Sequence, residues 1–459
     1  MRGHTKTMLS LIVCISLTLA PTLAFGLVEW QNYEPDEANA VQSTGHMAKL
    51  ELDSNDNPRM LWIDSGNLLY AHLTNDEWLC ADGEPLSTGN AVVSTDTVLD
   101  GCLALDSNDI PHISWQSFAD NGESDIYTVN YATWDGEWVN AEGETSDYTM
   151  ITSDHNTAHE MALSTENKPS IVWCEMHGVS MIHLTDDGWE TQNGGIFDMD
   201  NPESGLLFEI STETLSPSLS FDSQDNPRIA WQQMVHHEGF GEWDIMYCAW
   251  DGDNWVDGDG DEFDLTNSGV GVPAYSFMVL NPQLTTDIGD VDNLAYNYIG
   301  FGPTGAESNV VYLKTIGDGW RCADDTPFNP LDKTVGNPAR VTNNGMSGSQ
   351  VIAIDDAGRP HIAWSALGDE TSDVLYTFND LSQWVCADGL ELNDSIPLSE
   401  NSANLSDNGS FSYPTSIVVD SDGHPHIAWV DNAGGEPEAS LQVSYVRWDG
   451  DEWVTPIRD

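Results

Sequence analysis

Residues 420–429 read Asp-Ser-Asp-Gly-His-Pro-His-Ile-Ala-Trp, and residues 355–364 read Asp-Asp-Ala-Gly-Arg-Pro-His-Ile-Ala-Trp. In both stretches a polar turn precedes a proline, and a short apolar run then ends in tryptophan. Proline suits the first residue of a strand, because that position needs no N–H for the ladder. Each stretch therefore predicts the end of one β-strand, a tight turn and the start of the next strand.

The same pattern recurs along the chain, with an aromatic residue in its last position. Successive aromatic positions lie 53 to 68 residues apart, a spacing that suits four short strands with long connectors. The pattern predicts an all-β fold, a seven-bladed β-propeller of four-stranded antiparallel blades, over residues 48–459. The fifth repeat is the most degenerate, because Asp292 replaces its proline. The aromatic positions are Trp62, Trp115, Trp173, Trp231, Tyr296, Trp364 and Trp429.

Antiparallel blades give the two faces of the ring different roles. The two tight turns of each blade lie on one face, which we call the tight-turn face. The connectors between second and third strands and the linkers between blades lie on the other, the long-connector face. Because loops on a rigid scaffold carry most binding sites, we expect a site on the long-connector face.

The N-terminus has the layout of a secretory signal peptide over residues 1–26: Arg2 and Lys6, an apolar stretch and then small residues. Residues 27–47 are expected to form an N-terminal extension that includes a possible closing strand, paired with the last blade to cover its edge. This organisation predicts a secreted protein, extracellular or periplasmic.

The charge balance is strongly acidic, with 76 acidic and 13 basic residues and a net charge of −63. Such a surface repels nucleic acid and anionic lipid. Its acidity is interpreted as adaptation of the surface to salt or for solubility, and the alternative is binding of divalent cations or basic partners.

Six cysteines follow the leader, an even number that permits disulfides in an oxidising compartment. If one pair forms, Cys80 with Cys102 is the first expectation. The sequence has no Cys-x-x-Cys pair, which argues against a zinc ribbon or a thioredoxin-like site.

The repeat resembles that of secreted bacterial propellers whose blades read Asp-Ser-x-Gly-x-Pro-His-Ile-Ala-Trp. It is also similar to the NHL-type blade and, more loosely, to the Asp-box (BNR) turns of sialidase-like propellers, although no repeat has Thr directly before its Trp. The resemblance implies the propeller fold, which hosts lectins, hydrolases, lyases and scaffolds. A sialidase-like site would need an arginine cluster, but Arg59, Arg228 and Arg359 flank the repeat proline, where they are interpreted as structural.

Histidines fall into two groups. Those directly after the repeat proline, His112, His361 and His426, are interpreted as structural. A second group lies on the predicted connectors and is the candidate ligand-binding set, suited to a transition metal or to general acid–base chemistry. His159 is expected beside this group, in the same linker as its first member. The candidate set is His155, His177, His236, His237 and Glu238.

One acidic stretch resembles the start of a calcium loop. Asp257, Asp259 and Asp261 alternate with glycines, as oxygen ligands of calcium do. Ser268 occupies the position of the closing bidentate ligand, so the site is partial at most. A solvated acidic linker is the favoured interpretation, and a partial calcium site is the alternative.

The favoured interpretation is an exported, non-enzymatic binding or scaffold propeller that presents its long-connector face to a glycan, an extracellular protein or a cation. The alternative is a carbohydrate-active enzyme, either a sialidase-like glycoside hydrolase or a polysaccharide lyase.

Overall fold

The computed structural model describes residues 47–455 of the chain, apart from several short segments. The predicted signal peptide and the extension up to residue 46, including its proposed closing strand, therefore lie outside the described residues. The segments left out are 87–90, 121–124, 147, 154–157, 176–177, 200, 238–239, 264–277, 303–304, 318, 330–337, 343–346, 368–370, 394–402, 407–410 and 433–440.

The predicted all-β propeller is confirmed, and its described strands fall into seven consecutive four-stranded antiparallel units, the blades. Blade 1 contains β1 (Ala48–Leu52), β2 (Pro58–Asp64), β3 (Asn67–Thr74) and β4 (Glu77–Leu79), with β5 (Val92–Ser94) beside β3. Blade 2 contains β6 (Thr97–Leu105), β7 (Pro111–Asp120), β8 (Asp125–Trp134) and β9 (Trp138–Val139), with β10 (Thr149–Ser153) beside β8. Blade 3 contains β11 (His159–Leu163), β12 (Pro169–Glu175), β13 (Gly178–Thr185) and β14 (Gly188–Thr191), then the helix η1 (Pro202–Gly205) and β15 (Leu206–Glu209) beside β13.

The other four blades repeat this order. Blade 4 contains β16 (Thr214–Phe221), β17 (Pro227–His237), β18 (Phe240–Trp250) and β19 (Trp255–Val256). Blade 5 contains β20 (Met278–Thr286), β21 (Asp292–Gly302), β22 (Gly305–Thr315) and β23 (Trp320–Arg321). Blade 6 contains β24 (Ser347–Ile354), β25 (Pro360–Leu367), β26 (Ser372–Asn379) and β27 (Trp384–Val385). Blade 7 contains β28 (Phe411–Val419), β29 (Pro425–Asn432), β30 (Leu441–Trp448) and β31 (Trp453–Val454).

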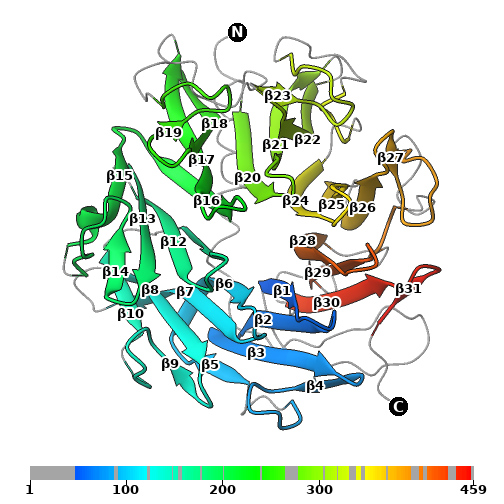
Figure 1. Cartoon of the computed structure of the whole chain (residues 1–459). Coiled ribbons are helices and arrows are strands. Elements are labelled where there is room, and N and C mark those ends of the chain that lie inside the picture. Colours follow the sequence, from blue (N-terminus) through cyan, green and yellow to red (C-terminus); the bar gives the residue numbers. More distant parts are fainter. Residues whose placement is uncertain are drawn as a thin grey trace.

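The blades form a ring in which the first strand of each blade lies nearest the centre (Figure 1). Blade 1 meets blade 7 to close the ring, and the Leu50 N–H donates to Ser416 Oγ at 3.0 Å across this junction. Ala48 and Leu50 share one apolar core with Val430 and Val443 of blade 7. The single described helix is one 3-10 turn, so no helix in the described part of the chain has the length and apolar character of a membrane span.

The repeated aromatic residues build the cores between blades. The seven positions of the Trp62 series are all buried, with at most 2% exposure. At six junctions a third-strand tyrosine packs edge-on against the fourth-strand tryptophan of the next blade. Tyr70 and Trp138, for example, have ring centroids 5.6 Å apart. The other pairs are Tyr131–Trp189, Tyr247–Trp320, Tyr312–Trp384, Tyr376–Trp453 and, across the closing junction, Tyr445–Trp78.

The turn between first and second strands has a physical reason for its Asp-Ser-x-Asp sequence. Asp53 Oδ1 accepts the N–H groups of Asn55 and Asn57, both at 2.9 Å, which holds the turn closed. Asp56 has the left-handed backbone, φ 61°, that Asp and Asn tolerate better than most residues. Equivalent Asp or Asn side chains reach the preceding blade, where they bind its turn.

We call this contact between blades the turn clasp. Ser54 of blade 1 donates its N–H and its O–H to the two carboxylate oxygens of Asp109 in blade 2, both at 2.7 Å. At two junctions of blade 6 the acceptor position holds Gly358 or Gly423, so the clasp has no side-chain acceptor in these described turns. Further clasps are Ser107–Asn167, Thr165–Asp225, Ser223–Asp290 and, across the closing junction, Ser421–Asp56.

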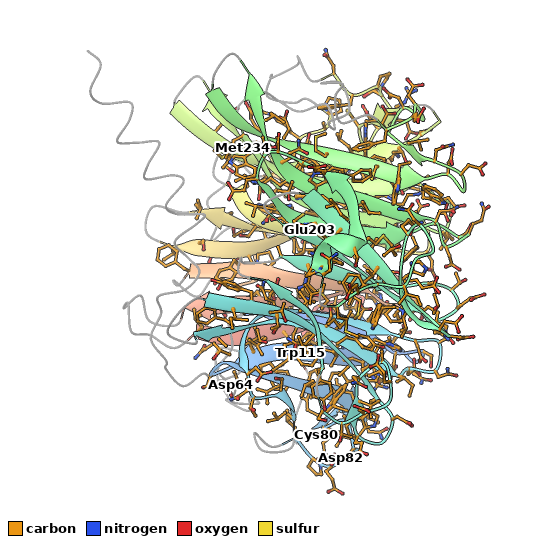
Figure 2. The ribbon with its side chains drawn as sticks, turned by 90° about the vertical axis from the view of Figure 1, so that its left-hand side faces the viewer. Asp64, Cys80, Asp82, Trp115, Glu203 and Met234 are labelled. Atoms are coloured by element: carbon orange, nitrogen blue, oxygen red, sulfur yellow. The ribbon has the colours of Figure 1, made fainter. Side chains whose placement is uncertain are left out.

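The tight-turn and long-connector faces are separated as predicted. Asp64 and Met234, near the ends of second strands, lie toward the left of Figure 2, which is the long-connector face. Trp115 lies near the middle of the same view. The connector between the second and third strands of blade 4 is mostly a hairpin, because β17 and β18 continue through it.

Candidate functional site

Basic residues after the repeat proline have the structural role that the sequence predicts. Arg59 binds the turn residue Asp53, Nη2 to Oδ2 at 3.0 Å. His361 Nδ1 lies 2.7 Å from the Tyr376 hydroxyl, and the imidazole also approaches Asp355. Burial lowers the pKa of His361, which keeps the ring neutral at ordinary pH. An Asp, a basic residue and a third-strand Tyr therefore form a repeated triad that joins turn to blade.

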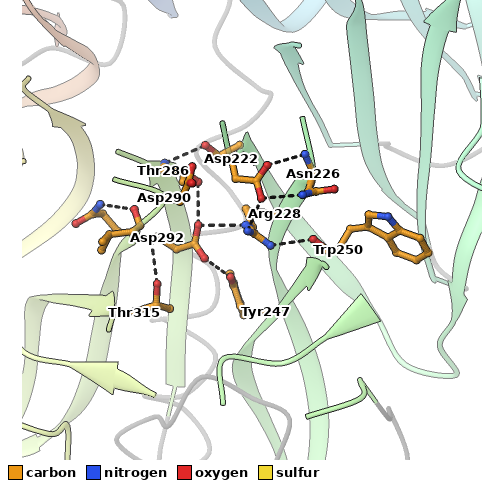
Figure 3. Close-up of polar contacts among 12 residues, drawn as sticks. Asp222, Asn226, Arg228, Tyr247, Trp250, Thr286, Asp290, Asp292 and Thr315 are labelled. Atoms are coloured by element: carbon orange, nitrogen blue, oxygen red, sulfur yellow. Dashed lines mark hydrogen bonds and ion pairs between the residues drawn. The ribbon is translucent and has the colours of Figure 1, made fainter. Parts of the chain in front are cut away.

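Blade 4 contains the most extensive of these clusters (Figure 3). Arg228 Nη2 binds Asp222 Oδ2 at 2.7 Å, and its Nε lies 3.6 Å from Asp292 Oδ1 in blade 5. Tyr247 donates its hydroxyl to the same Asp292. Burial raises the pKa of Asp292. The residue that makes the fifth repeat degenerate thus joins the two blades, and the cluster is part of the scaffold.

The predicted ligand-binding set falls almost wholly outside the described residues. His155, His177 and Glu238 are not among them, and only the backbone of His236 and His237 is described, at the end of β17. The register places His236 opposite Gly241 and His237 opposite Phe240, at the long-connector end of the hairpin. These residues remain a prediction.

His159 differs from the expectation that placed it in a linker. It begins the inner strand β11 and is 4% exposed. Its Nε2 lies 3.1 Å from Ser114 Oγ of blade 2, and burial lowers the pKa of the imidazole. His159 is therefore a buried, neutral residue in the junction between blades 2 and 3.

The acidic stretch predicted to bind calcium contains a repeated turn. Asp257 Oδ1 accepts the N–H groups of Asp259 and Asp261, both at 3.0 Å, and the Asp257 N–H donates to the Asp261 carbonyl at 2.8 Å. The same backbone turn follows the fourth strand in other blades, at Cys80 and Asn140 for example. No group of three metal-ligating side chains occurs within the described ranges, and Asp264 and Ser268 lie outside them. Calcium binding stays a prediction, with a structural reason for Asp257 already in place.

The expected disulfide is not formed. All six cysteines described are free and buried. Cys80 lies in the core between blades 7 and 1, whereas Cys102 lies in the core between blades 2 and 3. The guess of a Cys80–Cys102 pair was wrong because the two thiols belong to different junctions.

One cluster of ionisable residues was not identified from the sequence. In each blade, one residue of the first strand, which is the inner strand, pairs with the third residue after the start of the second strand. We call the seven residues at this position one level of the ring. In blade 1 this residue is Lys49, which pairs with Leu61. This level carries Lys49 and Glu160 in blades 1 and 3 but uncharged residues in the others. The sequence signal that could have revealed the cluster is a charged residue at an inner-strand position where the other repeats have an uncharged one. The full level is Lys49, Cys102, Glu160, Ser218, Gln283, Val351 and Ser416.

Lys49, Glu160 and the adjacent Glu51 form what we call the inner-strand cluster. The Glu160 carboxylate raises the pKa of Lys49 more than any other group. Burial, followed by the Glu160 charge, raises the pKa of Glu51 to about 8. Burial also raises the pKa of Glu160. The pKa values of Lys49, Glu51 and Glu160 are thus all raised, and strongly shifted pKa values are frequent at functional sites.

The inner strands are irregular on the long-connector side of the level that contains Lys49 and Glu160. Register shifts occur in β6, β16, β20, β24 and β28, on the long-connector side of the cluster. The Asn281 N–H donates to Gln232 Oε1 at 3.3 Å across the junction of blades 4 and 5. Bulges of this kind bend a strand and redirect its side chains, often beside active sites.

Comparison with solved structures shows the fold. A structure of an ulvan lyase from polysaccharide lyase family PL25 has a TM-score of 0.54 and 10% identity, over 91% of this chain and 97% of that chain. A structure of an ulvan lyase of that family bound to -[GlcA(1-4)Rha3S]- has a TM-score of 0.53 and 11% identity, over 91% of this chain and 96% of that one. No protein-family model and no curated protein matches the sequence. These neighbours are polysaccharide lyases, so the comparison contradicts the preference for a non-enzymatic propeller.

Proposed function

We propose that this protein is a carbohydrate-active enzyme, a polysaccharide lyase that cleaves uronate-containing glycans. One observation carries the proposal: nearly the whole ring matches that of a polysaccharide lyase, in one structure with a glucuronate-containing fragment bound. The cluster of Lys49, Glu51 and Glu160 supports it, because these ionisable residues depart from the repeat and are not needed to build the blade.

The chemistry of a lyase sets what the site must contain. A base removes the proton from the carbon next to the uronate carboxylate, the bond from the neighbouring carbon to the glycosidic oxygen breaks, and a carbon–carbon double bond forms between the two carbons. The departing oxygen takes up a proton from an acid. A cation beside the carboxylate stabilises the negative charge that develops on it.

Lys49 is the proposed cation. Its positive charge is held by Glu160, and its side chain is only half-buried. Arg340 is a poorer candidate because its side chain is 1% exposed and binds Glu307 at 2.9 Å. Glu51, which keeps its proton to about pH 8, is the proposed acid. The proposed base comes from the connectors, with His236 and His237 at the end of β17 as candidates.

The experiment is a turnover screen on acidic polysaccharides: a sulfated glucuronate–rhamnose polymer, polygalacturonate, alginate and hyaluronan. Ultraviolet absorbance of the unsaturated uronate and the release of reducing ends are measured together. A lyase raises both signals, whereas a hydrolase raises only the second. Absence of both signals for every polymer would refute the proposed function.

Variants then test the assignments. Lys49→Met removes the cation and is expected to lower kcat/KM by roughly 100-fold or more, as loss of a charge-stabilising group does. Gln283→Met, at the same inner-strand level in blade 5, makes a similar change in size without removing charge and is the matched control. Equal activity of the two variants would reject Lys49. A His236→Ala/His237→Ala variant with full activity would reject the two histidines as the base.

A further inference from the structure

A cavity of about 510 Å³ lies on the tight-turn face, between blades 3 and 4. Its lining comes from the first turn, second strand and third strand of blade 3 and from the facing turn of blade 4. Ser170, Met181 and His183 form one part of it, and Phe221 and Trp250 another. It is thus on the face opposite to the one expected to carry catalysis.

The cavity exists because blade 3 lacks the repeated triad. Where blade 4 has Asp222, Arg228 and Tyr247, blade 3 has Ser164, Ser170 and Met181 in the same register. Ser170 and Met181 are smaller than the basic residue and the tyrosine that they replace. All three replacements line the cavity.

The aromatic contact between blades 3 and 4 also differs from that at the other junctions. Elsewhere the third-strand tyrosine packs against the fourth-strand tryptophan of the following blade, but Met181 has no phenol ring to do so. Trp255 of blade 4 packs instead against Phe208 from β15, with ring centroids 5.7 Å apart. Phe208 thus replaces the missing tyrosine ring in the contact with the fourth-strand tryptophan, and the space on the tight-turn face stays open.

One histidine that lines this cavity differs from its equivalent in blade 1. His183 Nδ1 is buried and has no hydrogen-bond partner among the described residues. The equivalent His72 of blade 1 has both nitrogens occupied, by Thr74 Oγ1 at 3.1 Å and the Cys80 carbonyl at 3.0 Å. The described chain thus leaves hydrogen-bonding capacity of His183 unused, whereas it uses both ring nitrogens of His72.

The charges at the cavity select the ligand class. Glu166, Asp186 and Asp225 outnumber Lys168, which binds Asp186 at 2.6 Å, so an anion is disfavoured. Ser164 replaces the turn carboxylate that holds arginine in blade 4, and Asp186 and Asp225 already bind Lys168 and Thr165, so an arginine-like cation lacks the partner that Arg228 has. Burial lowers the pKa of His183, which leaves the imidazole neutral.

We propose that this cavity binds a neutral sugar residue. Carboxylate oxygens, Gln192 and His183 supply donors and acceptors for hydroxyl groups, and Trp250 and Phe221 supply apolar surface for the ring. The volume lies within the usual range for small-ligand sites. The proposal concerns binding alone and does not depend on the proposed lyase activity.

A variant that restores the repeat tests the proposal. Ser164→Asp/Ser170→Arg/Met181→Tyr rebuilds in blade 3 the triad of blade 4 and fills the cavity. Tryptophan fluorescence and ligand-observed NMR are used to titrate the full chain with rhamnose, xylose, galactose and glucose. The wild type is expected to bind at least one sugar, and the filled variant is expected to bind it at least about tenfold more weakly with an unchanged or higher Tm.

Two further variants keep the test decisive if the triple variant fails to fold. His183→Ala removes one hydrogen bond without filling the cavity and is expected to weaken binding by about fivefold to tenfold. Gln224→Ala, exposed on the blade 4 turn and outside the lining, is the control and should bind as the wild type does. The proposal is overturned if no sugar binds, if the filled and His183 variants bind normally, or if free arginine binds where the sugars do not.

Discussion

Removing the turn clasps should lower the melting temperature by an amount that their geometry sets. The perturbation is alanine in place of the five hydroxyl residues, each at a different junction. Each change removes a side-chain hydrogen bond of 2.6 to 2.9 Å, four of them to a carboxylate. Hydrogen bonds to charged groups contribute about 1.5–3 kcal/mol, and we take about 1 kcal/mol because these turns are exposed. The five changes are Ser54→Ala, Ser107→Ala, Thr165→Ala, Ser223→Ala and Ser421→Ala.

The sites lie at separate junctions, so their effects should add to about 5 kcal/mol. An unfolding entropy of about 2.1 cal/mol/K per residue over roughly 400 residues converts this to a Tm lower by about 6 °C. Ile288→Ala/Asp356→Ala changes the same turn position at the two junctions without an acceptor and should leave Tm within about 1 °C of the wild type. Differential scanning calorimetry at one protein concentration measures both. A five-site variant that melts with the wild type, or a control that falls as far, would refute the clasp.

Two other expectations follow from buried groups. The pKa of Glu51 rises from 4.5 to about 8 on folding, so the folded state holds a proton that the unfolded state releases, and wild-type stability falls as the pH rises between these values. The Tm of Glu51→Gln should therefore rise relative to that of the wild type across this pH window, and the difference should stay constant above it. A difference in Tm that is the same at every pH would contradict the shift. The six described cysteines are buried, and burial raises the pKa of Cys102 and Cys248. A thiol reagent should therefore modify none of the six in the native protein and all of them in urea. Rapid labelling of the native protein would contradict their burial.

The fold was predictable because the closing contacts repeat. Each second strand begins at the expected residue, from Pro58 to Pro425, including Asp292 in the degenerate repeat. A proline that needs no ladder N–H and a turn closed by its own Asp are local features, so a single repeat carries the signal. The buried tryptophans then repeat because every junction between blades presents the same space.

The sites were less predictable because they depend on contacts between distant residues. Lys49 and Glu160 lie in blades 1 and 3, with blade 2 between them in sequence, and their charges interact only when the ring forms. Ser170 and Met181 are ordinary residues by themselves, and they matter because larger side chains stand in their register positions elsewhere. His159 was assigned to the linker although it is the first residue of β11, because strand ends are the least certain part of a sequence-based prediction.

The repeat also separates structural acidity from functional acidity. Asp53 closes its own turn, and Asp56 binds the turn of blade 7, so both carboxylates are required by the ring itself. Asp257 likewise holds the turn after the fourth strand. A repeated acidic residue therefore needs no cation to explain it, however negative the whole chain is. Glu160 differs, because other blades have uncharged residues such as Ser218 or Val351 at its level, and its charge raises the pKa of Lys49. The acidic residues that stand outside the repeat are accordingly the ones to test for chemistry.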